Sequence, residues 1–325
     1  MHHLSRERLE SILDRARGVR VAVVGDLMLD VYLVGSVSRI SPEAPVPVVH
    51  VAEERYALGG AANVAANVVT LGAACDLIGC VGSDPAGRQI RHELDALGVR
   101  ACVSERADRP TTTKTRVVAR HQQVVRFDRE SDEDLPDDCC DELCELVRAS
   151  VATSDALVLE DYNKGVLVPR VIRAAIEAAE QAGIPTVVDP KFRHFFDYTG
   201  ATVFKPNSVE LGNAVGTRIR PDDDAWLEEA RTTVGARHLL LTLGEDGMAL
   251  RSDDGTSFRI PTVAREVYDV SGAGDTVTAV VAVALAAGAT MREAATLANV
   301  AAGIEVGKPG VATVTPQELR DMLAH

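Results

Sequence analysis

Apolar residues along this chain occur as short runs that alternate with longer stretches in which apolar and polar positions mix at helical spacing. The first run, residues 19–24, is rich in valine and ends at Gly25, which is typical of a strand buried on both faces of a parallel sheet. We expect similar strands at residues 76–81, 156–159, 186–189, 201–204 and 238–243.

Helical stretches separate these runs, at residues 61–71, 85–97, 169–182 and 225–234. Strands that alternate with helices predict an α/β fold, in which a central, mostly parallel sheet lies between layers of helices.

The uncharged stretch 276–291 has 16 residues. Since ~20 apolar residues are needed to span a bilayer, we expect a buried core helix there and no membrane partner. A second apolar helix is expected at residues 293–306.

Two segments break the alternation of strands and helices. Residues 31–52 are rich in valine and proline, and residues 101–128 contain a partly exposed strand-like run at 111–118. We see no internal repeat and no shift of composition along the chain. The simplest organisation is one domain over residues 1–325, with a small β lid inserted in these two pieces.

Composition and charge narrow the possible partners. The chain is 46% hydrophobic and 25% charged, which is typical of a globular protein, and its net charge is −14. Such a charge argues against nucleic acid or an anionic membrane as a partner, so an anionic substrate must be held by a few local residues. The six cysteines show no C-x-x-C spacing and no secretory segment precedes them, so we expect reduced thiols and a cytoplasmic location.

The segment 269–276 carries the strongest chemical signal. Gly272, Ala273 and Gly274 allow backbone amides to point into one concavity at the start of the apolar helix, where the helix dipole also favours an anion. Asp275 can accept a proton at the same place. This combination favours phosphoryl transfer to a hydroxyl, although a tight turn with an acidic residue at a helix start would look the same.

Two other segments resemble phosphate-binding loops but lack residues that such loops need to bind phosphate and magnesium. Residues 82–87 have the glycine spacing of a Walker A loop but lack the following lysine and serine or threonine, and residues 303–308 are one position short. Gly25 is followed by Asp26 and not by the G-x-G-x-x-G of a dinucleotide-binding dehydrogenase, which disfavours that class of enzyme.

Five motifs occur in an order that resembles the ribokinase/PfkB family of sugar kinases. They are residues 25–30, the Gly59-Gly60-x-x-Asn63 turn, Asn207-x-x-Glu210, residues 242–247 and the final Gly-Ala-Gly-Asp at 272–275. The resemblance covers essentially the whole chain. It implies a ribokinase-like three-layer sandwich with a β lid, and ATP and Mg²⁺ as cofactors.

The resemblance also implies roles for residues on the nucleotide side. Asp275 would be the general base, and the amides of Gly272, Ala273 and Gly274 would form the anion hole. Glu210 would act on Mg²⁺ through water beside Asn207, although the two also fit a helix capping box. Further candidates for nucleotide binding are Thr242, Gly244, Gly247 and Asn299. Asn299 fits the role of a hydrogen-bonded core residue nearly as well.

On the sugar side, the resemblance assigns acceptor hydroxyls to a set of carboxylate, glycine and amide positions. These are Asp26, Asp30, Gly59, Gly60 and Asn63. Three further stretches, residues 38–48, 161–165 and 189–191, resemble one branch of the family, the bacterial heptose 7-phosphate 1-kinases. In bifunctional members that kinase is joined to an adenylyltransferase. The branch implies phosphorylation of the anomeric hydroxyl of D-glycero-D-manno-heptose 7-phosphate, in lipopolysaccharide precursor synthesis.

A phosphorylated sugar needs positive charge at its binding site. We expect some of Arg39, Lys164 and Lys191 to hold its distal phosphate, with Lys114 and Arg116 as weaker candidates.

The chain ends without an H-x-G-H motif, so we expect a stand-alone kinase that works with a separate adenylyltransferase. The resemblance further implies a homodimer formed through the lid and leaves activation by a monovalent cation open. The alternatives are another sugar or sugar-acid kinase of the same family and a non-catalytic sugar- or nucleotide-binding regulator.

Overall fold

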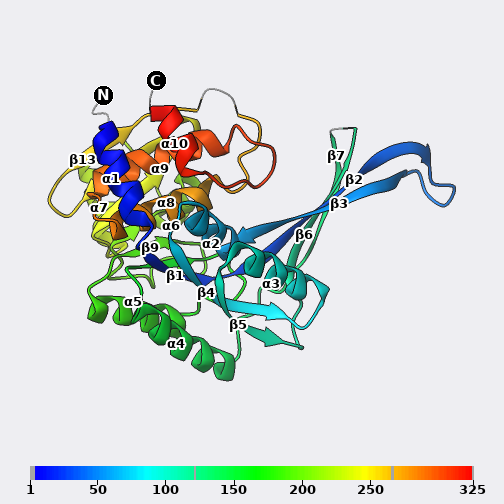
Figure 1. The fold of residues 1–325 in the computed structure, drawn as a ribbon, viewed down its shortest axis with the longest axis horizontal. Coiled ribbons are helices and arrows are strands. Elements are labelled where there is room, and N and C mark those ends of the chain that lie inside the picture. Colours follow the sequence, from blue (N-terminus) through cyan, green and yellow to red (C-terminus); the bar gives the residue numbers. More distant parts are fainter. Residues whose placement is uncertain (1–3, 121, 265–266, 324–325) are drawn as a thin grey trace.

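A nine-stranded sheet forms the centre of the molecule in the computed structural model, which describes residues 4–120, 122–264 and 267–323 (Figure 1). The strands lie in the order β13 (Ser257–Ile260), β12 (Met248–Ser252), β11 (His238–Thr242), β10 (Val203–Phe204), β9 (Thr186–Asp189), β8 (Ala156–Glu160), β1 (Arg20–Gly25), β4 (Ala74–Gly82) and β5 (Arg100–Arg106). All neighbours from β11 to β5 are parallel, and β12 and β13 add an antiparallel edge.

Helices cover both faces of this sheet. One side carries α1 (Arg6–Ala16), α2 (Ala61–Thr70), α3 (Pro85–Leu97), α8 (Ala273–Ala286), α9 (Met291–Glu305) and α10 (Pro316–Leu323). The other side carries α4 (Asp137–Val151), α5 (Pro169–Ala182), α6 (Ser208–Val215) and α7 (Asp224–Thr233). Val21 and Val23 of β1 pack into the first core, whereas Ala22 and Val24 pack into the second. This alternation is what a strand buried on both faces requires, and the predicted α/β sandwich is confirmed.

The apolar C-terminal region forms the two helices expected near residues 276–291 and 293–306, but with different boundaries. Helix α8 ends at Ala286, Gly288 adopts a positive φ of 80°, and α9 begins at Met291 with Thr290 as its cap. Within the described ranges, no helix combines the length and apolarity that a membrane crossing needs.

The lid is a separate four-stranded sheet with the order β3-β2-β6-β7 in the described part of the chain. It consists of β2 (Leu27–Ile40), β3 (Pro47–Gly60), β6 (Thr112–Ala119) and β7 (Gln122–Arg129). The paired strands β2 and β3 project from the body as a long arm (Figure 1).

The lid boundaries differ from the expected ones. Residues 100–106, which we expected in the lid, form β5 at the edge of the main sheet, parallel to β4. The buried carboxylate of Asp76 explains this position, because it accepts a hydrogen bond from Arg20 at 2.8 Å and pairs with Arg100. The ion pairs therefore hold β1, β4 and β5 together at one end.

Candidate active site

The N-terminus of α8 presents backbone amides beside a cleft, and the Ala273 amide makes only a long contact, 3.5 Å, with the carbonyl of Val270. Gly272 is the N-cap with a φ of +95°, and no side chain of the described residues caps this helix. A Cβ at Gly272 would lie 2.9 Å from Nδ2 of Asn63, so a side chain there meets both backbone strain and a steric clash. Ala273 and Gly274 line the cleft. The first amides of a helix have no partner within it, so this end can bind an anion, as predicted from the sequence.

Asp275 lies in the first turn of the same helix and is 3% exposed. Its two carboxylate oxygens accept one hydrogen bond each, from Asn63 Nδ2 at 2.8 Å and from the Tyr162 hydroxyl at 2.7 Å. Burial raises the pKa of Asp275 to about 6; the two hydrogen bonds oppose the shift, and the nearby Asp189 adds to it. The group is therefore a fixed carboxylate at neutral pH whose affinity for a proton is higher than that of an ordinary aspartate.

Asn63 is oriented by its own helix. Asn67 donates to the side-chain oxygen of Asn63 at 3.2 Å, which leaves the Asn63 amino group to point at Asp275. Helix α2 begins at Gly60, whose φ of +58° is open to glycine but strained for other residues. Asn63 was expected to bind sugar hydroxyls. In the structure its amino group contacts Asp275, the predicted catalytic base.

A cleft of about 650 Å³ lies beside this helix end. Its walls include all six positions predicted for nucleotide binding, namely Asn207, Glu210, Thr242, Gly244, Gly247 and Asn299. Apolar residues line another part, among them Val267, Val270 and Val306. A cleft with an apolar wall and a few polar groups is typical of a small-molecule site.

Asn207 and Glu210 form a capping box at the start of α6. The Asn207 side-chain oxygen accepts from the amides of Val209 and Glu210 at 2.9 and 2.8 Å, and one oxygen of Glu210 accepts from the Asn207 amide at 2.8 Å. The other Glu210 oxygen forms an ion pair with Lys191. The structural role is therefore present, and it holds a carboxylate at the cleft wall.

Thr242 and Asn299 also have structural contacts. The Thr242 amide donates to the carbonyl of Pro206 at 3.0 Å, which joins the end of β11 to the start of α6. The Asn299 side chain donates to the carbonyl of Pro261 at 2.8 Å. Both residues still line the cleft, so the core role and the cleft position coexist.

Lysine and acidic side chains meet on the floor of the cleft. Lys205 is 3% exposed and donates to Asp189 at 2.8 Å. Burial would lower the pKa of Lys205, but Asp189 and Glu160 outweigh burial and raise it. The Lys191 ammonium also lies 5.1 Å from the centre of the Tyr162 ring. The cleft thus contains two charged ammonium groups, as an anionic ligand requires.

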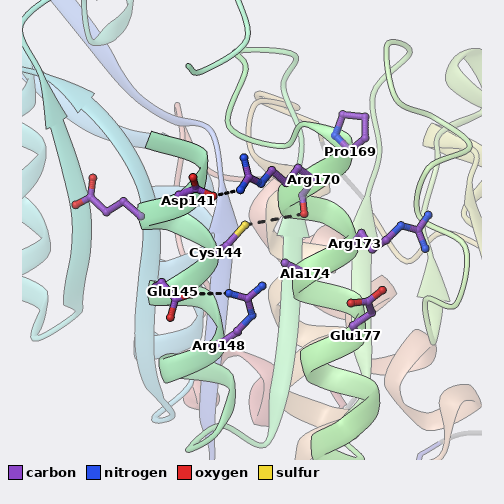
Figure 2. Close-up of a pocket in the computed structure, with 10 residues that line it drawn as sticks. Asp141, Cys144, Glu145, Arg148, Pro169, Arg170, Arg173, Ala174 and Glu177 are labelled. Carbon is purple, nitrogen blue, oxygen red and sulfur yellow. Dashed lines mark hydrogen bonds and ion pairs between the residues drawn. The ribbon is translucent and has the colours of Figure 1, made fainter. Parts of the chain in front are cut away.

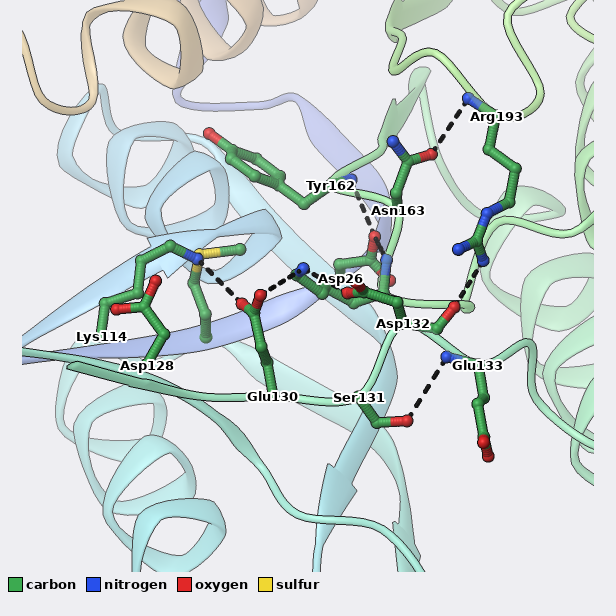
Figure 3. A network of polar contacts seen from close by, with 12 residues as sticks. Asp26, Lys114, Asp128, Glu130, Ser131, Asp132, Glu133, Tyr162, Asn163 and Arg193 are labelled. Carbon is green, nitrogen blue, oxygen red and sulfur yellow. Dashed lines mark hydrogen bonds and ion pairs between the residues drawn. The ribbon is translucent and has the colours of Figure 1, made fainter.

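Asp26, which we expected to bind a substrate hydroxyl, contacts the backbone of a loop in this chain. Its carboxylate is buried and accepts the backbone amide of Tyr162 at 2.8 Å (Figure 3). It also accepts the backbone amides of Lys164 and Val166 at 3.0 and 3.1 Å. Burial raises the pKa of Asp26, and these backbone hydrogen bonds oppose the shift. Asp26 therefore fixes the loop after β8 and so sets the position of Tyr162.

Asp30 lies where the lid joins the body. It is 4% exposed and forms an ion pair with Arg116 of β6, whose guanidinium stands 5.4 Å from the centre of the Tyr32 ring. Gly59 packs against it, since a Cβ there would lie 2.7 Å from Asp30 Oδ2.

The candidate phosphate-binding residues do not gather in one place: Lys191 lines the cleft beside α8, and the others lie elsewhere. Lys164 pairs with Glu130 at 3.0 Å and with Asp132 at 2.5 Å. Lys114 lies 3.9 Å from the same Glu130 (Figure 3). Arg39, by contrast, is an exposed residue near the outer end of β2. Within one chain, Arg39 is therefore not brought together with Lys164 or Lys191.

A second hollow, of about 750 Å³, lies on the surface between α4 and α5 (Figure 2). Arg148 pairs with Glu145 at 2.7 Å along the α4 wall, and Arg170 of α5 pairs with Asp141 of α4. None of the predicted site residues lines it, whereas the predicted nucleotide-binding residues line the cleft beside α8.

Comparison with known proteins agrees with this geometry. The model of the pfkB family of carbohydrate kinases matches residues 19–318. The chain belongs to this family. It is therefore an ATP-dependent carbohydrate kinase, as the sequence motifs predicted.

Relatives within the pfkB family include the "Bifunctional protein HldE" of Geotalea uraniireducens, 45% identical over 99% of this chain and 66% of the relative. The protein of the same name from Pelobacter propionicus is 46% identical over 99% of this chain and 66% of the relative. The chain thus spans about 66% of the length of these two relatives.

Solved structures share the fold. Arabidopsis thaliana ribokinase, complexed with ribose and ATP, superimposes with a TM-score of 0.73 at 22% identity and covers 94% of this chain and 99% of its own. Escherichia coli phosphofructokinase-2 in complex with potassium gives 0.78 at 21% identity, with 94% and 98% covered.

Sequence reasoning missed three side chains of this pfkB kinase site, namely Tyr162, Asp189 and Lys205. Tyr162 and Asp189 lie in the stretches 161–165 and 189–191, which resemble the heptose kinase branch. Neither of these two residues was given a role from the sequence. The available signal was position: Asp189 ends a parallel strand, and ligands of α/β sheets bind at the carboxyl ends of strands.

Proposed function

We propose that this kinase transfers the γ-phosphoryl group of ATP to the anomeric hydroxyl of D-glycero-D-manno-heptose 7-phosphate and so forms the 1,7-bisphosphate. The observation that carries the kinase chemistry is the buried Asp275 at the N-terminus of α8, beside the first amides of that helix and two lysines. The substrate rests on the branch-specific stretches and on the relatives named bifunctional protein HldE.

The cleft fits a nucleotide and its metal. Its volume of about 650 Å³ lies in the usual range for such ligands. The valine-lined wall suits a purine base, and Thr242 and Gly244 lie where phosphates would pass towards α8. Glu210 would hold Mg²⁺ through water, and the metal would neutralise charge on the phosphates. Lys191, its present ion-pair partner, would then be free to contact a phosphate.

Asp275 would take the proton of the attacking hydroxyl. The sugar oxygen forms the new bond to phosphorus, the bond from phosphorus to ADP breaks, and the hydroxyl proton moves to the carboxylate. Asn63 and Tyr162 hold the carboxylate in one orientation, and the amides of Ala273 and Gly274 stabilise the transferring group. A base of this kind typically contributes about 10²- to 10⁴-fold in rate.

The distal phosphate of the sugar would be held by Lys164 and Lys114. Both side chains are mostly buried, with exposures of 14% and 16%, and both lie near Glu130. Burial lowers the pKa of Lys114, and Glu130 and Asp30 oppose the shift. The Glu130 carboxylate lies 3.9 Å from the Lys114 ammonium, which is a long distance for an ion pair. A sugar phosphate could take its place and form charge-assisted hydrogen bonds with both lysines.

The lid would also mediate formation of a homodimer. Its strands expose apolar side chains that nothing in the described chain covers, among them Ile40, Tyr56, Val125 and Phe127, and Phe127 is 54% exposed. Strands β3 and β7 are open edges, which favours pairing with a second copy. Sedimentation of Phe127→Ser beside wild type tests this proposal, because a monomeric wild type would contradict it.

An ATP-dependent reaction and reduced thiols would both agree with the expected cytoplasmic location.

The substrate is tested by measuring ADP release from purified protein with Mg²⁺, with heptose 7-phosphate, ribose, fructose 6-phosphate or 2-keto-3-deoxygluconate as the acceptor. The proposal predicts the highest kcat/KM for the heptose phosphate. Preference for another acceptor would keep the mechanism and overturn the substrate, and no turnover with any acceptor would favour a regulator.

A further inference from the structure

Three buried carboxyl groups meet behind the proposed base. Glu160 ends β8 and lies in register with Asp189 at the end of β9, while Asp275 reaches the same point from α8. One carboxylate oxygen of each residue lies within 4.8 Å of the other two. The mechanism above uses Asp275 only, so the presence of Glu160 there needs its own explanation.

Glu160 is completely buried, and neither of its oxygens has a hydrogen-bond donor among the described residues. Its neighbours in the cluster are carboxylates, which accept hydrogen bonds and do not donate them unless protonated. A buried, ionised group without a partner is strongly destabilising. Glu160 therefore lacks the compensation that an ionised carboxylate would need.

The charged groups that face Glu160 come from several elements. They are Asp189 of β9, Asp275 of α8, Lys205 after β10 and Lys191 after β9. Both lysines are already engaged, because Lys205 donates to Asp189 at 2.8 Å and Lys191 pairs with Glu210. The Lys205 ammonium at Asp189 also disfavours a divalent cation at the same carboxylate, since the two positive charges would repel each other.

We propose that Glu160 carries a proton in the resting enzyme and, as a neutral acid, is a positioning residue for Asp275. The proton makes Glu160 a donor to the carboxylate cluster and removes one negative charge beside the base, so that Asp275 can be ionised at neutral pH. Burial raises the pKa of Glu160 well above its usual range, Asp189 and Asp275 add to this, and the two lysines oppose it. The kinetic role rests on the proposed function, whereas the protonation state does not.

Infrared spectra of the purified protein at pH 7, without substrates, test the protonation state directly. A protonated carboxylic acid has a carbonyl stretch that carboxylates lack. Burial also raises the pKa of another buried glutamate, Glu305, to about 8, so Glu305 contributes its own component to this band. We therefore expect a component that is present in wild type, lost in Glu160→Gln and retained in the matched variant Glu305→Gln. Absence of any band that depends on Glu160 would overturn the proposal. Mn²⁺ binding without nucleotide that is lost in Glu160→Gln would also overturn it, because a cation would then replace the proton.

The acid limb of the kcat/KM profile tests the positioning role. Glu160→Leu removes the donor and should raise the midpoint of that limb by about one pH unit, roughly the effect of one hydrogen bond to a charged group. Glu160→Gln keeps a donor without a charge and should leave the midpoint close to that of wild type. A downward shift in Glu160→Gln would mean that an ionised Glu160 had raised the pKa of Asp275, and would overturn the proposal. The infrared result needs no turnover, so failure of the proposed function is distinguishable from failure of this inference.

Discussion

The side-chain nitrogen of Asn63 lies 2.8 Å from Oδ2 of Asp275, although 212 positions separate the two residues in the sequence. This contact joins the start of α2 to the start of α8, so the Gly-Gly turn and the Gly-Ala-Gly-Asp turn meet at one carboxylate. The hydrogen bond orients the base, and the Tyr162 hydroxyl holds its other oxygen.

The pH dependence of turnover should report Asp275. Burial raises its pKa to about 6, and only the ionised carboxylate can accept the hydroxyl proton. As the pH falls through about 6, the base becomes protonated and kcat/KM should fall about tenfold per pH unit. A profile that stays flat down to pH 4.5 would show that another group, or none, acts as the base.

Tyr162→Phe should shift this profile to higher pH. The hydroxyl donates to Asp275 at 2.7 Å and lowers the pKa of that carboxyl group. Its removal should raise the midpoint of the acid limb by about one unit, with a smaller effect on ATP binding. Tyr268→Phe is the matched control, because Tyr268 is 72% exposed. An unchanged midpoint in Tyr162→Phe would contradict the hydrogen-bond role.

Much of the fold is readable from hydrophobic periodicity, since β1 and β8 are short apolar runs and α5 has a regular apolar face. The boundaries of the lid were harder to predict from the sequence. The position of β5 involves pairing between Asp76 and Arg100, which are not adjacent in the sequence. Side-chain roles were the least readable. Asp26 and Asn63 have the residue types of sugar ligands, but only the fold shows that they contact the loop after β8 and Asp275.

Gly272→Ala should destabilise the start of α8. The positive φ of 95° and the 2.9 Å approach to Asn63 Nδ2 together should lower the free energy of unfolding by about 1 to 3 kcal/mol. Gly274→Ala is the internal comparison, because the nearest atoms to a Cβ there, Asp189 Oδ2 and Lys205 Nζ, lie at 3.6 and 3.7 Å. Equal stability of the two variants in denaturant titrations would argue against the strained cap.

Lys164→Gln should weaken binding of a phosphorylated sugar. Loss of one mostly buried positive charge should raise KM for the heptose phosphate about tenfold or more, with kcat less affected. Arg39→Gln is the matched control within one chain, because Arg39 is exposed near the end of the lid arm. An increase in KM for Arg39→Gln equal to that for Lys164→Gln would indicate that a partner's arm reaches the site.

The most direct test of the central claim is phosphorus NMR of the product formed from ATP, Mg²⁺ and heptose 7-phosphate, with Asp275→Asn alongside. The account predicts a new phosphate resonance coupled to the anomeric proton, formed at a rate about 10²- to 10⁴-fold lower in the variant. Phosphate transfer to a different hydroxyl, or an Asp275→Asn variant as fast as wild type, would contradict it.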